Sequence, residues 1–213
     1  MKYVAALIFS IFAAGCYHQN SAFYRPGMLK EKAYIGNHDA AGVQLKYIGE
    51  DDQGLTSGVV LNKKYGLILL VGHGSSWETK RVFVQMASNS DDEEWIPAWP
   101  FAIDHEQDLA VFYVDPKKAK FKYDVTVYGG KSDNLESEQV YLISYPLGVM
   151  RHVVTFGYVI SGFQPEVLGV TPHNAVDIWA QRGSSGGPMF LQKNHKLIGI
   201  FRVIMSGAAL APT

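Results

Sequence analysis

Short apolar runs separated by turn residues recur along most of the chain, roughly every ten residues, as is typical of short strands joined by tight turns. No stretch of about 12 or more residues follows the helical period, which disfavours long helices. The first half of the chain therefore predicts six strands, at residues 43–48, 57–62, 66–71, 81–88, 95–103 and 109–114.

A second group of strands follows a basic, proline-led stretch, DPKKAKFK at residues 115–122, which we interpret as a linker. The expected strands of this group are residues 125–128, 139–144, 152–161, 175–180, 188–192 and 196–203. Strands that do not alternate with helices favour packed antiparallel units over a βαβ architecture. The sequence therefore predicts an all-β protein of two six-stranded antiparallel β-barrels, residues 40–116 and 117–213.

The N-terminus differs from the rest of the chain. The first fifteen residues carry one lysine followed by an apolar run that is shorter than the roughly 20 residues of a membrane-spanning helix. The run ends in AAGC at residues 13–16, which resembles a bacterial lipobox although Ala13 stands where leucine is usual. We expect residues 1–15 to be a signal peptide, Cys16 to carry a lipid anchor to a bacterial membrane, facing the periplasm or the cell exterior, and residues 16–39 to be a spacer. Two alternatives stay open, a secretory signal cleaved nearby and an uncleaved anchor.

Composition and charge exclude several function classes. The formal net charge is −1, from 19 basic and 20 acidic residues, and we find no Lys/Arg cluster suited to phosphates, so nucleic acid is not an expected partner. Cys16 is the only cysteine, so an internal disulfide is impossible. The segment from His105 to Asp108 lacks the paired histidines of a zinc protease, and we expect neither a metal nor a cofactor.

The segment GSSGGP at residues 183–188 carries the clearest chemical signal. A serine hydroxyl is a poor nucleophile until a base takes its proton and backbone N–H groups stand ready for the charge that develops on the substrate carbonyl. Glycines permit a turn that aims successive amides at one point, here those of Gly183 and Ser185. The same letters fit the nucleophile elbow of α/β-hydrolases, but those enzymes place the acid after the serine, and no Asp or Glu follows Ser185.

The order histidine, aspartate, serine is available instead. His73 ends the apolar run GLILLVGH, and Asp108 immediately precedes the run LAVFYV. Both side chains are therefore expected at strand ends, where a cleft could lie. Taken alone, each is more easily interpreted as a structural residue, His73 at a strand end and Asp108 as a turn residue before a strand.

Together, these three local patterns resemble those of the HtrA-like bacterial serine proteases, a trypsin-like group with the chymotrypsin fold. That family carries its base after a Gly-x-Ile-Leu strand, its acid in Asp-Leu-Ala-Val and its nucleophile in Gly-Asn-Ser-Gly-Gly-Pro. Further segments, residues 128–148, 156–162 and 197–200, resemble the family as well, so the resemblance extends over about residues 40–203. The family often adds PDZ domains, whereas this sequence resembles the type without one.

The resemblance implies an active site in the cleft between the two barrels and a role for each site residue. Ser185 would attack the scissile carbonyl, His73 would accept and return its proton, and Asp108 would orient the imidazole. The amides of Gly183 and Ser185 would form the oxyanion hole.

The sequence departs from the family at several positions around this site. Gly72 replaces the alanine before the histidine, and Arg202 stands where the family has Ser or Thr supporting the acid. The arginine could pair with Asp108 and draw it away from the histidine, or it could point outward. Trp179, Arg202 and Val203 are the candidates for the substrate pocket, and a tryptophan that points inward would leave room only for small side chains.

Two functions stay open on sequence alone. The first is a membrane-tethered serine endopeptidase acting on exported or unfolded polypeptides through an acyl-enzyme. The second is a catalytically inactive binding or scaffold lipoprotein of the same fold. The sequence sets no oligomeric state, and it leaves the physiological substrate open.

Overall fold

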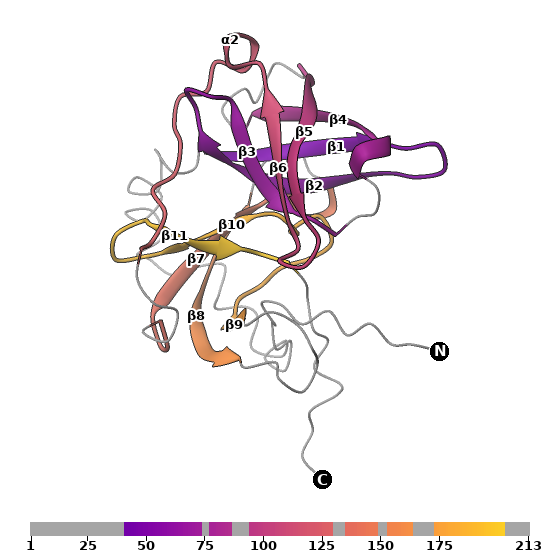
Figure 1. Cartoon of the computed structure of the whole chain (residues 1–213). Helices are drawn as coiled ribbons and strands as arrows, with labels where there is room; N and C mark the ends of the chain where they lie inside the picture. Colours follow the sequence, from indigo (N-terminus) through magenta and orange to yellow (C-terminus); the bar gives the residue numbers. More distant parts are fainter. Residues whose placement is uncertain are drawn as a thin grey trace.

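The first structural unit is a closed antiparallel barrel of six strands. The computed structural model describes residues 41–73, 77–86, 94–129, 135–148, 153–163 and 173–202 of the 213-residue chain. The barrel strands are β1 (Gly42–Ile48), β2 (Gln53–Asn62), β3 (Leu67–Val71), β4 (Arg81–Met86), β5 (Ile96–Asp104) and β6 (Leu109–Val114). Their order in space is β1-β2-β3-β6-β5-β4, and β4 pairs back onto β1 to close the barrel (Figure 1).

The barrel closes around alternating apolar side chains, as the period of two in a half-buried strand requires. Ile68 and Leu70 of β3 point inward and are fully buried. Trp77, from the 3₁₀ turn η2 (Trp77–Thr79), fills the barrel end and meets Phe112 edge-on, with 5.5 Å between ring centroids. Its Nε1 donates to the Gly72 carbonyl at 3.0 Å, so the barrel core also holds the backbone next to His73.

The second unit is a curled antiparallel sheet with the order β11-β10-β7-β8-β9. Its strands are β7 (Gln139–Ser144), β8 (Val153–Phe163), β9 (His173–Asp177), β10 (Pro188–Leu191) and β11 (Leu197–Ile200). Residues 125–128, predicted as a strand, lie along β11 through a parallel bridge from Val127 to Leu197 and the bond from Leu197 N to Thr126 O, 2.8 Å. The predicted all-β, two-barrel fold class is confirmed, but in the described residues the second unit has five strands where six were predicted, because residues 125–128 form only an isolated bridge.

The two units pack on each other through apolar side chains. Val59 and Val71 of the barrel share a buried cluster with Tyr141, Ile143 and Phe190 of the second sheet. The rings of Tyr141 and Phe190 stack at 5.1 Å between centroids. Figure 1 shows β7, β10 and β11 lying directly beneath the barrel. Burial across this junction fixes the strand ends of one unit against the loops of the other.

The observed elements differ from those predicted by sequence in several places. β2 begins at Gln53, before the predicted residue 57, because it continues the β1–β2 hairpin, in which Ile48 pairs with Gln53. β9 ends at Asp177, so Trp179 follows the strand rather than lying within it. The stretch 115–122 contains a short helix, α2 (Pro116–Ala119), which Asp115 caps by accepting from Lys117 N at 3.0 Å.

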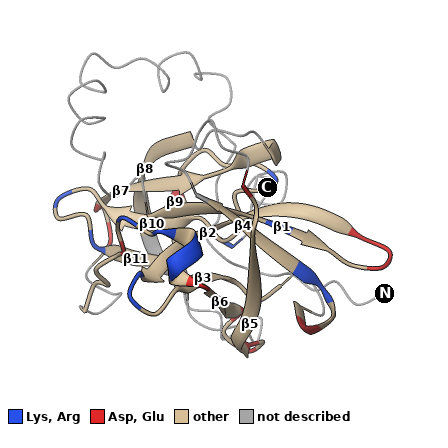
Figure 2. Ribbon diagram, turned by 90° about the horizontal axis from the view of Figure 1, so that it is seen from above, with Lys and Arg blue, Asp and Glu red and all other residues tan. Residues whose placement is uncertain are grey.

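The linker also brings exposed lysines together, which the sequence analysis missed. Lys63, in the turn after β2, donates through Nζ to the Lys122 carbonyl at 3.3 Å, and α2 carries Lys117 and Lys118 (blue in Figure 2). This lysine group lies at the end of β6 opposite Asp108. No helix in the described ranges is long and apolar enough to cross a membrane.

Candidate active site

Two strand ends bring His73 and Asp108 together. β3 and β6 pair antiparallel, with Val71 opposite Leu109, so the residue after one strand meets the residue before the other. The amide of Gly72 donates to the Asp108 carbonyl at 2.8 Å and continues that ladder by one bond. A Cβ at Gly72 would lie 3.0 Å from the carbonyl carbon of Asp108, so the glycine allows a closer approach than the alanine usual in the family.

The carboxylate of Asp108 hydrogen-bonds His73 through both of its oxygens. His73 Nδ1 lies 2.6 Å from Oδ2, and the backbone amide of His73 donates to Oδ1. A carboxylate only accepts, so Nδ1 carries the proton and Nε2 is left as an acceptor. The Asp108 side chain is 8% exposed and that of His73 is 44% exposed, so the acid is buried while the imidazole reaches solvent.

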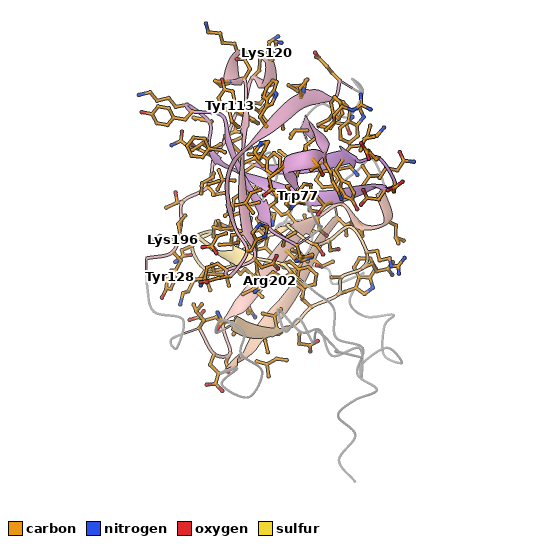
Figure 3. All side chains as sticks on the ribbon, turned by 45° about the vertical axis from the view of Figure 1, so that its right-hand side comes forward. Trp77, Tyr113, Lys120, Tyr128, Lys196 and Arg202 are labelled. Carbon is orange, nitrogen blue, oxygen red and sulfur yellow. The ribbon has the colours of Figure 1, made fainter. Side chains whose placement is uncertain are left out.

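Arg202 pairs with the same carboxylate, which resolves the alternatives left open by the sequence. Its Nε donates to Asp108 Oδ2 at 2.5 Å, and its side chain is only 10% exposed. Figure 3 places Arg202 where the barrel meets the second sheet. The arginine therefore does not draw Asp108 away from His73, since Oδ2 accepts from both side chains.

Burial raises the pKa of Asp108, but hydrogen bonds and charge from His73 and Arg202 outweigh that effect and hold it below its ordinary value of 3.8. A lowered pKa in the folded state means that the ionised carboxylate stabilises the fold above the unfolded-state pKa, and that this contribution is lost as pH falls through the folded-state pKa.

We therefore expect Asp108→Asn to be less stable than the wild type at neutral pH, with a difference that shrinks in acid. The asparagine leaves the buried Arg202 without its counter-charge at neutral pH, whereas in acid the wild-type carboxyl also becomes neutral. Urea unfolding of both proteins between about pH 3 and pH 7 measures the difference. A difference independent of pH would contradict the assigned shift.

Ser185 lies in a turn that hydroxyl groups of β2 hold in place. The Ser185 carbonyl accepts from Thr56 Oγ1 at 2.6 Å and from the Ser57 amide at 2.8 Å. Its own Oγ donates to the Arg202 carbonyl at 2.9 Å. Within the described residues no hydrogen bond joins Ser185 to His73.

The carbonyl groups of Gly183 and Ser185 accept hydrogen bonds from the protein, whereas their amide groups do not donate to any described carbonyl. Ser57 Oγ donates to the Gly183 carbonyl at 2.6 Å and accepts from Tyr145 N at 2.9 Å. Gly183 has φ +90°, a conformation that favours glycine. In the part of the chain that the structure describes, the amides of Gly183 and Ser185 donate to no protein carbonyl, so both N–H groups are available to a substrate oxygen.

Ser184, which replaces the family's Asn or Asp, is fully buried inside the turn. Its Oγ donates to Ser144 Oγ at 3.2 Å and accepts from the Gln181 amide at 3.2 Å. The smaller side chain is therefore accommodated by bonds to the β7 end. Thr56 and Ser57 were missed by the sequence analysis, and the one signal for them is a pair of adjacent hydroxyl residues within an otherwise apolar strand.

Residues 47–200 match the family described as trypsin-like peptidase domain. The chain belongs to this family. A search of curated protein sequences gives no match.

Solved structures show the same fold for this peptidase domain. The structure of Deg5 superposes with a TM-score of 0.69 at 18% identity, covering 86% of this chain and 90% of Deg5. The HtrA-type protease AlgW gives 0.65 at 23% identity over 80% of this chain, which spans about half, 53%, of the AlgW chain. The active form of Rv3671c protease from M. tuberculosis gives 0.63 at 13% identity over 94% of this chain and 82% of that one. At these identities the likeness establishes the two-barrel, chymotrypsin-like fold.

The structure gives a different outcome for each substrate-pocket candidate of this peptidase domain. Trp179 is partly buried and its carbonyl accepts from Thr155 Oγ1 at 3.0 Å. Arg202 is turned toward Asp108 rather than outward. Val203 and Cys16 lie outside the described residues, so their expected roles stay predictions.

Proposed function

We propose that the protein is a serine endopeptidase in which Ser185 is the nucleophile, His73 the general base and Asp108 the orienting acid. The observation that carries this proposal is that two hydrogen bonds join Asp108 to His73 at the junction of the two units. The serine turn, with two available amides, lies at the same junction. A buried acid that fixes the imidazole tautomer, a solvent-reaching base and preformed N–H donors are what acyl transfer to a serine requires.

Catalysis requires one rotation of the Ser185 side chain. Oγ would leave the Arg202 carbonyl and turn to His73 Nε2, which takes the proton as Oγ bonds to the scissile carbonyl carbon. The negative charge then forms on the carbonyl oxygen, in reach of the Gly183 and Ser185 amides. His73 returns the proton to the departing amine, and water, deprotonated by the same imidazole, hydrolyses the ester and restores Ser185.

The alternative is an inactive binding or scaffold protein, and one observation favours it. Ser185 Oγ rests on the Arg202 carbonyl, and Asp108 Oδ2 is shared between Arg202 and His73. A rotation about a side-chain bond between staggered positions is inexpensive, and bonds at catalytic sites are often incomplete before substrate binds. We therefore favour the enzyme.

The test is proteolysis of an unfolded protein. Purified protein lacking residues 1–15 should convert casein into fragments, and a serine-directed fluorophosphonate should stop the reaction. Intact mass of the products identifies the cleaved bonds. A folded preparation that leaves casein intact across pH 6 to 9 would favour the scaffold alternative.

We further propose that Cys16 anchors the enzyme to a membrane through lipid, so that it acts on exported or unfolded polypeptides. The AAGC sequence at residues 13–16 supports this. Replacement by Cys16→Ser should abolish incorporation of an alkyne-labelled fatty acid. It should also release the protein from the membrane fraction, because no cysteine remains to take up the acyl chains, more than one of which is needed for firm binding. Incorporation that persists in the variant would refute the anchor.

A further inference from the structure

A groove of about 520 Å³ adjoins Gly183, the first of the two candidate oxyanion donors. It shares no residue with His73, Asp108 or Arg202. Its lining comes from both structural units and consists of Lys46, Gln53, Gly54, Leu55, Trp95, Leu147, Gly148, Arg182 and Gly183.

The groove is built against the nucleophile turn. Leu147, in the 3₁₀ turn η4 (Pro146–Gly148), donates its amide to the Arg182 carbonyl at 2.6 Å. This bond ties the groove wall to the residue before Gly183. On the barrel side, Leu55 pairs with Lys46 across the β1–β2 hairpin and is followed directly by Thr56, which bonds the Ser185 carbonyl. A chain in the groove would therefore lie next to the scissile bond.

The described lining of the groove carries charge of one sign. Lys46 and Arg182 contribute a cation from each unit, and no Asp or Glu is among the described lining residues. Within the described residues neither cation forms an ion pair, whereas Lys80 pairs with Asp52 at 2.6 Å and Arg202 with Asp108. Lys46 Nζ lies 6.0 Å from the centre of the Trp95 ring, so aromatic and aliphatic walls lie around the charges. The acidic turn at residues 50–52 forms the tip of the same hairpin (Figure 2) and carries none of the lining.

The position of the groove decides which part of a substrate it meets. The residues of a substrate before the scissile bond are expected against the β11 side, where Arg202 follows the strand and its carbonyl meets Ser185. The groove adjoins Gly183 and the barrel hairpin instead, and it shares no residue with the pocket candidates of that other side. It would therefore hold the residues that leave with the amine.

We propose that this groove binds the leaving-group side of the substrate and selects an Asp or Glu side chain within the first three residues after the scissile bond. The selectivity rests on the proposed function, and it follows from two cations that form no ion pair among the described residues, in a lining whose described residues include no Asp or Glu. Such partly exposed pairs give modest energies that salt weakens. We expect an acidic peptide to be favoured about three- to ten-fold over its neutral match at low ionic strength.

The first experiment profiles cleavage sites in a proteome-derived peptide library. Four proteins are compared: the wild type, the double variant Lys46→Gln/Arg182→Gln, a matched control Lys117→Gln/Lys118→Gln with the same charge change on the distant helix α2, and Ser185→Ala as the blank. Wild type and control should enrich Asp and Glu in the three positions after the cut, and the groove variant should lose that enrichment. Equal enrichment in the groove variant, or none in the wild type, would overturn the proposal.

The second experiment does not depend on turnover. Fluorescence anisotropy measures how Ser185→Ala binds two labelled peptides that differ only by Glu or Gln two residues from a free N-terminus. The Glu peptide should bind more tightly, and the difference should vanish with Lys46→Gln/Arg182→Gln added and shrink in about 0.5 M salt. Charge-selective binding without any proteolysis would uphold the groove and defeat the endopeptidase. Proteolysis without charge selectivity would do the reverse.

Discussion

Ser185→Ala should lower kcat on an unfolded protein substrate by roughly 10⁴- to 10⁶-fold while leaving the fold intact. Without Oγ no acyl-enzyme forms, and only the oxyanion donors and substrate binding remain to assist attack by water. Among the described residues Oγ forms one hydrogen bond, to the Arg202 carbonyl, so its removal should change the unfolding free energy by about 1 kcal/mol or less. Single-turnover kinetics and urea unfolding on the same preparations separate the two effects.

A variant that keeps more than a tenth of wild-type turnover would place the nucleophile elsewhere in the chain. Ser184→Ala is the comparison that checks the assignment, because its hydroxyl is buried and, among the described residues, bonds Ser144 at the end of β7 and the Gln181 amide. We expect Ser184→Ala to lower the free energy of unfolding more than it lowers kcat.

Asp108→Asn should lower kcat by roughly 10⁴-fold near neutral pH. In the wild type, Oδ2 of Asp108 accepts from both His73 Nδ1 and Arg202 Nε. Asparagine keeps the shape of the side chain but presents an NH₂ group. Arg202 Nε only donates, so an amide N–H placed there can be accepted only by the imidazole, whose proton then moves to Nε2, where it blocks acceptance from Ser185. Measured kcat should therefore fall far more than KM rises.

Asp104→Asn is the matched control, since Asp104 ends β5 on the surface and its carboxylate accepts, among the described residues, from the Gln107 amide at 2.9 Å. It should retain activity within about two-fold, because exposed polar substitutions of this kind change little. Equal losses in the two variants would indicate a general electrostatic effect and contradict the orienting role of Asp108.

The sequence was sufficient for the parts of the site that local pattern controls. An apolar strand places His73 one residue beyond the end of β3, after Gly72, and another begins directly after Asp108, so their meeting follows once the two strands pair. β7 lies at residues 139–144 as predicted, because an uninterrupted apolar run begins there directly after polar residues. The glycine turn around Ser185 likewise has a local cause.

The parts that failed depend on contacts between distant segments. Nothing local to Thr56 and Ser57 announces that their hydroxyls bond Ser185 and Gly183, more than 120 positions away. Arg202 could not be oriented without knowing that a buried carboxylate lies within reach of its guanidinium. β2 extends to Gln53 because its partner strand supplies hydrogen bonds, although its first residues are exposed and carry little apolar signal.

The groove belongs to the same class of feature. Lys46 and Arg182 are 136 positions apart in sequence, as their numbers show, and only the packing of the two units makes them face one space. Taken separately, each is an ordinary surface cation. Together they gain significance because neither forms an ion pair among the described residues.

Labelling with a fluorophosphonate probe tests the central claim most directly, namely that His73 and Asp108 activate Ser185. The probe reacts with a serine whose proton a base removes, without any need to know the substrate. We predict that the folded wild type is labelled at Ser185, identified by peptide mass, and that Ser185→Ala and His73→Ala are not. A folded wild-type protein that takes up no label, or takes it up on another residue, would contradict the account.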